Sequence, residues 1–97
     1  MLSLPLKKIV AAQQGGGRGA SLWGVDLSNK LRCNYQQGPG TNWSGWSGEW
    51  AGSSPRNISK LAGCKQNNGV VQLWALVGNE LHTIYQNSPG GGWSNWT

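Results

Sequence analysis

The sequence contains few of the residues that a catalytic or metal site requires. Its 97 residues include three carboxylates, one histidine, two cysteines and no phenylalanine. Asp26, Glu49 and Glu80 do not occupy matching positions of the internal repeat, and His82 has no histidine partner. Paired carboxylates for glycoside hydrolysis would have to come from different chains, and no Cys/His spacing is typical of a zinc site. We therefore expect no enzymatic activity, no cofactor and no bound metal.

Long apolar runs are absent, and this has consequences for location. No segment approaches the roughly 20 apolar residues that a membrane helix requires, so we expect no membrane insertion. The start of the chain, Met1–Lys8, does not resemble a secretory signal, because its basic pair follows the apolar residues instead of preceding them. We expect cytoplasmic synthesis without a signal peptide, followed by a non-classical route if the protein is released.

Cysteines are too few and too irregularly placed to form a disulfide framework. The two copies of the repeat place Cys33 opposite Thr83 and Cys64 opposite Gln13. A framework of disulfides would be expected to recur with the fold. We expect two free, buried thiols, which are typical of a reducing compartment.

Acidic residues are scarce, which leaves a formal net charge of +5. The cations are scattered, and Lys7–Lys8 is the only adjacent pair. A basic patch for single-stranded nucleic acid would need cations and aromatic rings on one face. We therefore favour a generally basic surface and keep a nucleic-acid or protein interaction module as the alternative function.

Tryptophan and glycine are abundant, with seven and 16 residues. Six of the seven tryptophans lie in two similar stretches, offset by 51 residues at the first Trp and by 50 from Leu31 onward. A repeat of this length is typical of stacked or circular arrays. The first copy contains Leu22–Trp23, Leu31, Tyr35–Gln36, Pro39–Gly40 and Trp43–Ser44–Gly45–Trp46; the second contains Leu73–Trp74, Leu81, Tyr85–Gln86, Pro89–Gly90 and Trp93–Ser94–Asn95–Trp96.

Short β-strands are predicted in both copies. No window of useful length has a 3.6-residue period, and Gly, Asn and Ser interrupt the chain throughout. Turns are indicated at residues 15–17, 26–29 and 77–79. We expect strands at residues 9–13, 20–26, 31–36 and 43–46 in the first copy, and at 59–65, 70–77, 81–86 and 93–96 in the second.

The apolar patterns of these strands predict which faces are packed. Residues 70–77 are apolar at nearly every position, which indicates a strand covered on both faces. Leu31, Cys33 and Tyr35 alternate with polar residues, and their counterparts 81, 83 and 85 are of similar type. We expect this shared face to be packed in both copies, and the face with residues 32, 34, 36 and 82, 84, 86 to be partly exposed.

Together these patterns predict an all-β fold, a β-propeller with four-stranded antiparallel blades. Residues 1–50 would form one blade and residues 51–97 the second, within a single unit. Propellers contain four to eight blades, so two blades leave two faces open, and a chain this short is marginal alone. We therefore expect identical chains to complete a ring, with a trimer of six blades favoured and a dimer or tetramer as alternatives.

The string Tyr85–Trp96 resembles the repeats of bacterial β-propeller lectins related to the Photorhabdus fucose-binding lectin, and more loosely tectonin repeats. Those repeats combine an aromatic-Gln pair, a Pro-Gly-Gly-Gly turn and a Trp-Ser-Gly-Trp ending. The first copy, Tyr35–Trp46, has Thr41–Asn42 in place of Gly91–Gly92. Members of the family are usually single chains with all their blades. The resemblance implies non-catalytic binding of glycans, often fucose or O-methylated sugars.

The residue types of the repeat suit sugar binding independently of the resemblance. The C–H faces of a sugar pack on aromatic rings, and its hydroxyls need well-placed polar partners. The candidate carbohydrate-binding residues are Tyr35, Gln36, Asn42, Trp43, Trp46, Tyr85, Gln86, Trp93 and Trp96.

A structural role is the competing interpretation for every tryptophan. Within each Trp-Ser-x-Trp pair, we expect one ring to pack between blades and the other to approach the rim. Trp23 and Trp74 lie in apolar strands, so we expect them in the core. Trp50 has no counterpart in the second copy and would lie at a blade junction or at an interface with a neighbouring chain.

Overall fold

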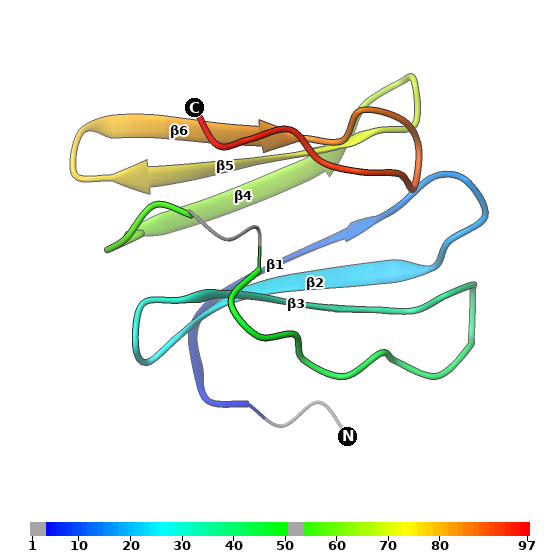
Figure 1. The fold of residues 1–97 in the computed structure, drawn as a ribbon, viewed down its shortest axis with the longest axis horizontal. Helices are drawn as coiled ribbons and strands as arrows, with labels where there is room; N and C mark the ends of the chain where they lie inside the picture. Colours follow the sequence, from blue (N-terminus) through cyan, green and yellow to red (C-terminus); the bar gives the residue numbers. More distant parts are fainter. Residues whose placement is uncertain (1–3, 51–53) are drawn as a thin grey trace.

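The computed structural model describes residues 4–50 and 54–97, and all of its regular structure is β. Strands β1 (Leu6–Gln13), β2 (Ala20–Asp26) and β3 (Leu31–Tyr35) form one antiparallel sheet in that order. Strands β4 (Lys60–Lys65), β5 (Val71–Val77) and β6 (Glu80–Tyr85) form a second sheet of the same topology (Figure 1). The predicted all-β class is confirmed. Within the described ranges no helix is present, and hence none that could cross a membrane.

The turn between β2 and β3 shows how local chemistry sets the strand ends. Asp26 closes β2, and its Oδ1 accepts hydrogen bonds from the N–H groups of Ser28 (2.8 Å) and Lys30 (3.0 Å). Asn29 takes a left-handed conformation with φ of 64°, which asparagine tolerates better than most residues. The predicted limits of β2 are therefore confirmed, whereas β1 begins earlier than expected, at Leu6, beyond an irregularity between Leu6 and Lys8.

The two sheets have the same arrangement of strands, but the turn after β1 is one residue longer than the turn after β4. Gln14 N–H donates to the Gly19 carbonyl, and Gln66 N–H donates to the Val70 carbonyl in the same role. The pairing of β1 with β2, and of β4 with β5, therefore makes Cys64 the equivalent of Ala12 in the second copy. The sequence-based match of Cys64 with Gln13 is wrong by one position, because the extra turn residue lies after β1.

The expected fourth strand of each repeat is not formed as a strand. Residues 43–50 run beside β3 (Figure 1), but they make only an isolated bridge between Gln36 and Trp43. Their N–H groups bond to β3 at every third residue: Ser44 to Tyr35 O (2.7 Å) and Ser47 to Cys33 O (2.9 Å). Three residues of this segment therefore span the same length as two residues of β3. This ratio is incompatible with a regular ladder of hydrogen bonds between strands.

Serine side chains compensate for this mismatch. The N–H of Tyr35 donates to Ser44 Oγ (3.2 Å), and the N–H of Cys33 donates to Ser47 Oγ (3.0 Å). In each case the hydroxyl occupies the place of the main-chain carbonyl that a true strand would present. The second copy repeats this arrangement once, between Tyr85 and Ser94 Oγ (3.1 Å). Residues 93–96 are therefore not a strand either, and make an isolated bridge from Trp93 to Gln86.

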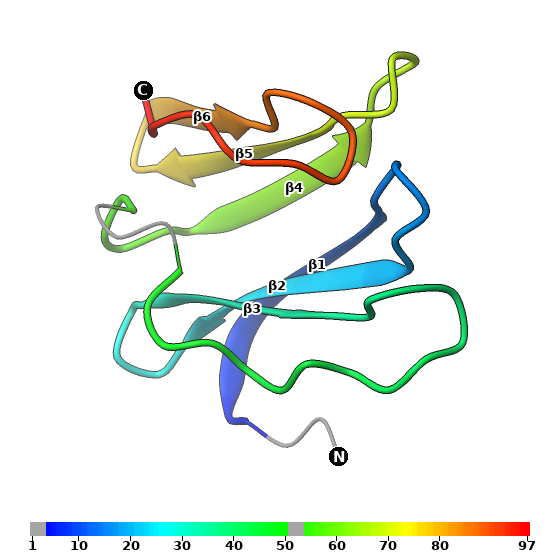
Figure 2. The same ribbon diagram turned by 45° about the vertical axis from the view of Figure 1, so that its right-hand side comes forward.

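The two sheets lie one above the other (Figure 2), and the buried residues between them come from one face of each sheet. We call the face that bears Trp23 in the N-terminal sheet and Trp74 in the C-terminal sheet the front face, and the opposite one, with Leu22 or Leu73, the back face. The core contains Trp23 from the first front face and Leu73 from the second back face. A Cβ on Gly63 would lie only 3.6 Å from Val10 Cγ2 across this interface.

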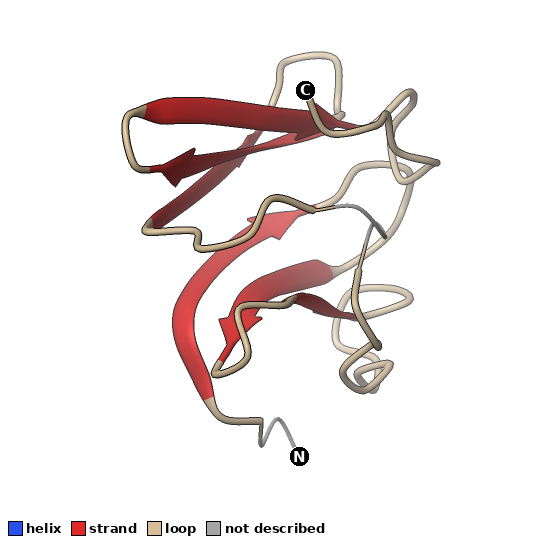
Figure 3. Cartoon of the chain, turned by 60° about the vertical axis from the view of Figure 1, so that its left-hand side comes forward, coloured by secondary structure: helices blue, strands red, loops and turns tan. Residues whose placement is uncertain are grey.

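This stacking covers the front face in only one of the two sheets. Leu31 is fully buried on the N-terminal front face, but its counterpart Leu81 is 67% exposed and Tyr85 is 47% exposed. The prediction that this face is packed is confirmed for the first copy and wrong for the second. On the back face, Ile84 and Gln86 of the second copy are buried instead of partly exposed. Asn34 of the first copy is buried as well, where its Oδ1 accepts the Gly45 N–H (3.0 Å). The cause is position, because within residues 4–50 and 54–97 no other sheet covers the front face of the second sheet (Figure 3).

Two other burial expectations change for the same reason. Val71, Leu73 and Ala75 are buried, but Trp74 on the opposite face of β5 is only half-buried, so this strand is not fully covered on both sides. Both cysteines are free, as expected, and Cys33 is buried, but Cys64 on the open front face is exposed.

Candidate functional site

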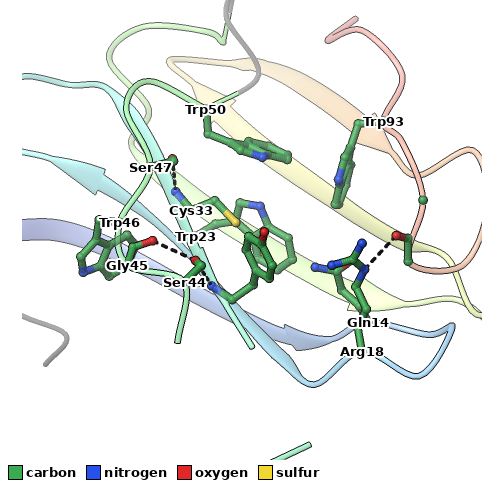
Figure 4. Close-up of a pocket in the computed structure, with 13 residues that line it drawn as sticks. Gln14, Arg18, Trp23, Cys33, Ser44, Gly45, Trp46, Ser47, Trp50 and Trp93 are labelled. Carbon is green, nitrogen blue, oxygen red and sulfur yellow. Dashed lines mark hydrogen bonds between the residues drawn. The ribbon is translucent and has the colours of Figure 1, made fainter. Parts of the chain in front are cut away.

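A cleft of about 420 Å³ lies between the two sheets. Its floor is the front face of the N-terminal sheet, with Trp23, Cys33 and Tyr35. The Ser44–Ser47 segment forms one side, and the turn that follows β6, with Gly90 and Gly91, forms another (Figure 4). The cleft is therefore built by both repeats and exists only because the sheets stack front on back.

Three tryptophan rings form the apolar part of the cleft. Trp23 and Trp50 lie 6.0 Å apart between ring centroids, Trp23 and Trp93 5.7 Å, and Trp50 and Trp93 4.9 Å, all in edge-to-face contact. Such pairs contribute about 0.5–1.5 kcal/mol each beyond burial. Trp93 comes from the second repeat, so this cluster also holds the two sheets together.

The indole N–H of Trp23 has no acceptor among the described residues, although the nitrogen is buried. A buried donor without a partner costs about 1–3 kcal/mol. The same holds for the Trp46 indole N–H, from another residue of the cleft lining.

Arg18 is the cation of the cleft and joins the two repeats. Its Nε donates to the Gly90 carbonyl at 3.0 Å, and its guanidinium carbon lies 5.7 Å from the centre of the Tyr35 ring. The first contact fixes the turn of the second repeat over the cleft, and the second is within the range of a cation–π interaction. The terminal nitrogens of the guanidinium form no hydrogen bond within the described residues, so they are available to a ligand.

A buried amide network lies beside Arg18. Gln14 Nε2 donates to Ser21 Oγ, and Gln14 Oε1 accepts from Gln86 Nε2 at 2.8 Å. Gln86 Oε1 accepts the N–H of Val71 at 2.8 Å. Because Gln14 belongs to the first repeat and Gln86 to the second, this network fixes the relative position of the sheets and of the Gln14 side chain in the cleft lining.

Ionisation in and near the cleft is limited. Burial raises the pKa of the Cys33 thiol to about 12, so it is a neutral thiol at physiological pH and a poor nucleophile. Asp26 lies at the far end of β2. Its burial acts to raise the pKa, but hydrogen bonds from Lys30, Arg32 and Ser28 outweigh this effect and hold the pKa below its ordinary value. The described residues contain no cluster of three or more potential metal ligands.

The structure brings only some of the predicted site residues together. Tyr35, Trp46 and Trp93 line the cleft, but the Trp46 ring is directed away from the other tryptophans (Figure 4). Trp96 is partly buried and packs against the core. Tyr85 lies in a second, more open hollow of about 510 Å³, which also contains Gln66, Asn67, Asn68, Val70 and Gln72.

The glutamines of the repeat hold the turns. Gln36 Oε1 accepts the Ala20 N–H (3.2 Å) and its Nε2 donates to the Thr41 carbonyl (2.9 Å). Gln86 does the same with Val71 and Gly91. Neither glutamine is part of the cleft lining, and the same is true of Asn42 and Trp43.

Sequence reasoning missed Arg18, Gln14 and Trp50 as cleft residues. Arg18 and Trp50 have no equivalent in the second copy, so a search for repeated positions could not find them. Gln14 does repeat, as Gln66, but only once the extra turn residue is known. The chain matches no protein-family model, and no curated protein sequence is significantly similar to it.

Proposed function

We propose that the protein is a non-catalytic carbohydrate-binding lectin and that the cleft between the sheets holds one sugar unit. Its volume of about 420 Å³ lies within the range of small-ligand pockets. The observation that carries the proposal is the pairing of exposed aromatic surface with unused donors. Trp50, Trp93 and Tyr35 offer ring surface, and the terminal nitrogens of the Arg18 guanidinium offer donors.

This combination suits a deoxy or O-methylated sugar. The methyl group or C–H face would pack on the rings of Trp50 and Trp93, and the remaining hydroxyls would accept hydrogen bonds from Arg18. The resemblance of the Tyr85–Trp96 string to propeller lectins points to fucose-like sugars. The neutral Cys33 thiol gives the cleft no nucleophile, which suits binding without chemistry.

We further propose that each sheet, with the segment bonded to its last strand, serves as one propeller blade. Front-on-back stacking of two equivalent sheets supports this, because it is the relation that can continue around a ring. Copies of the chain would complete the ring, with a trimer of six blades favoured over a dimer or a tetramer. Weak single sites on such a ring would gain roughly 10²–10⁴ in avidity.

A glycan array, run beside a single-stranded oligonucleotide titration at two salt concentrations, tests the function. We expect a glycan signal that salt does not change. Oligonucleotide binding that collapses with salt would instead support the nucleic-acid alternative, and silence on the array from the intact protein would contradict the lectin.

Site variants then locate the binding. Tyr35→Ala removes a ring of the cleft, and we expect it to weaken glycan binding about tenfold or more. Gln37→Ala, two residues away on an exposed turn, is the matched control and should bind normally. Equal binding by both folded variants would exclude the cleft as the sugar site.

A further inference from the structure

The turn between β4 and β5 contains the only Asn-Gly pair in the sequence, Asn68–Gly69. Gln66 N–H donates to the Val70 carbonyl (2.7 Å), and Gly69 N–H donates to the Gln66 carbonyl (2.9 Å). Gly69 takes a left-handed conformation with φ of 88°, as is typical of hairpin loops in which a turn is followed by a glycine. The hairpin therefore places a residue without a side chain directly after an exposed asparagine.

A hydrogen bond holds the Asn68 side chain towards the main chain that follows it. Asn68 Oδ1 accepts the Val70 N–H at 3.3 Å. Because this bond spans Gly69, it directs Asn68 Cγ towards the Gly69 nitrogen. The same bond polarises the side-chain carbonyl, and a donor at this oxygen stabilises the negative charge that develops when a nucleophile adds to the carbon.

We propose that Asn68 is a site of spontaneous deamidation, and that its isoaspartyl product loosens the contact between the two repeats. The Gly69 nitrogen gives up its proton, and its electron pair forms a bond to Asn68 Cγ. The Cγ–Nδ2 bond breaks, and ammonia leaves with a proton in place of the one that the Gly69 nitrogen lost. Water then adds to one of the two carbonyls of the resulting succinimide ring. Opening on one side gives aspartate, and opening on the other gives isoaspartate, whose main chain passes through Cβ.

Only a local opening of the turn is needed for this reaction. Gly69 N–H must release the Gln66 carbonyl before its nitrogen can attack. Asn67 and Asn68 are exposed, so water can replace this hydrogen bond. Openings of exposed turns cost far less than global unfolding. The reaction therefore proceeds in the folded protein, and it becomes faster as pH rises, because the nitrogen attacks after it has lost its proton.

Asn79 provides a comparison within the same chain. Every asparagine other than Asn68 precedes a residue that has a side chain. Asn79 is also exposed and also lies in a hairpin turn, between β5 and β6, but it precedes Glu80. The Glu80 side chain crowds the nitrogen that would attack, and Glu80 already belongs to β6. We therefore expect Asn79 to keep its amide.

The β4–β5 turn lies beside the β1–β2 turn and the turn that follows β6, at one edge of the molecule (Figure 1). A Cβ on Gly15 would lie only 2.6 Å from the Gly69 carbonyl oxygen, and a Cβ on Gly69 would lie 3.1 Å from Pro89 Cγ. Isoaspartate lengthens the main chain by one methylene immediately before Gly69. The closely packed Gly69 is then displaced from its contacts with both neighbouring turns.

These contacts contribute to the packing between the repeats. Gly15 belongs to the first repeat, and a Cβ on Gly90 of the second repeat would lie 2.8 Å from the Gly15 carbonyl oxygen. The Gly90 carbonyl also accepts Arg18 Nε at 3.0 Å. Displacement of the β4–β5 turn therefore removes support from the turns that join the two sheets. Aspartate does not lengthen the chain and only adds a carboxylate to the hollow that contains Tyr85.

Peptide mapping after incubation in mildly alkaline buffers tests the modification. Trypsin cleaves after Lys65, and the fragment from Gln66 to Thr97 contains both Asn68 and Asn79. We expect the mass change for exchange of an amide for an acid at Asn68, more rapidly in the more alkaline buffer. Methylation by protein L-isoaspartyl methyltransferase should detect isoaspartate in this fragment. Equal modification of Asn68 and Asn79, or a product with aspartate alone, would overturn the succinimide route.

Urea unfolding of two variants tests the structural consequence. Asn68→Ser keeps an oxygen that can accept the Val70 N–H but has no amide to lose, so its urea midpoint should not change during the incubation. Asn68→Asp carries the new charge without the longer main chain and should unfold close to fresh wild type. The isoaspartyl fraction of aged wild type should unfold at a lower urea concentration than Asn68→Asp.

The two variants separate the possible causes of a loss of stability. An isoaspartyl fraction with the same urea midpoint as Asn68→Asp would refute the loosened contact between the repeats. A loss of stability in aged Asn68→Ser as large as that in aged wild type would place the damage at another residue and overturn the proposal.

Discussion

Replacement of Gln86 by methionine should test how far one buried amide supports the fold. Gln86 is 2% exposed, and its side chain accepts the Val71 N–H and donates to Gln14 Oε1, both at 2.8 Å. Methionine fills a similar volume but leaves both groups without a partner. Each orphaned buried group costs about 1–3 kcal/mol, so we expect a loss of about 2–6 kcal/mol in the free energy of unfolding.

The repeat supplies an internal control for this change. Gln36 makes the equivalent bonds to the Ala20 N–H and the Thr41 carbonyl, but it is half-buried and its partners can bond to water. Gln36→Met should therefore cost only about 0.5–1.5 kcal/mol. The difference is large against a domain stability of about 5–15 kcal/mol.

Urea unfolding followed by tryptophan fluorescence measures both variants. Protein concentration must be held constant, because association would add to the apparent stability. Equal losses for Gln86→Met and Gln36→Met would refute the reasoning, since they would show that burial of the Gln14–Gln86 contact between the sheets adds nothing to the bonds within each repeat.

Three further outcomes are expected. Arg18→Gln should weaken glycan binding about tenfold or more, as expected for the loss of hydrogen bonds from a charged donor. Arg56→Gln, which affects only an exposed ion pair with Glu49, should leave glycan binding unchanged. Equal calorimetric affinities of the two variants would count against a role of Arg18 in binding. Because the pKa of Asp26 is lowered on folding, its contribution to stability is present above the ordinary value of 3.8 and is lost as pH falls below it; Asp26→Asn should flatten acid unfolding curves. Because the pKa of Cys33 is raised, stability should fall as pH rises from 9.0 towards about 12, and Cys33→Ala should remove part of that alkaline loss.

The strands and the repeat were predictable from sequence, because hairpin turns and alternation are local signals. The limits of β2 at Ala20 and Asp26 follow from such signals. The irregular segment in place of the fourth strand was not predictable from sequence. Its three-residue period matches neither a helix nor a strand, and its pairing depends on the hydroxyls of Ser44 and Ser47. A Trp-Ser-Gly triplet beside a strand could indicate this arrangement in other sequences.

The burial of a residue could be predicted from its counterpart in the other copy only where both residues have equivalent neighbours in the fold. Leu31 and Leu81 have the same residue type and local pattern, yet one is fully buried and the other is exposed. Only the order of the sheets distinguishes them. Likewise Tyr35 was predicted as a site residue through its repeat, whereas Arg18 was missed because the arginine occurs in one copy alone.

The serine-bonded segment beside β3 also bears on aggregation. An exposed strand edge invites other chains to add strands, and a tryptophan-rich sequence with few charges would be vulnerable to this. Residues 43–50 occupy the N–H and C=O groups at the edge of β3, through Ser44, Ser47 and the Trp50 N–H to Leu31 O. Because the segment advances three residues for every two of β3, its own outer side offers no regular ladder. The sheet therefore ends in an edge that a further strand cannot extend.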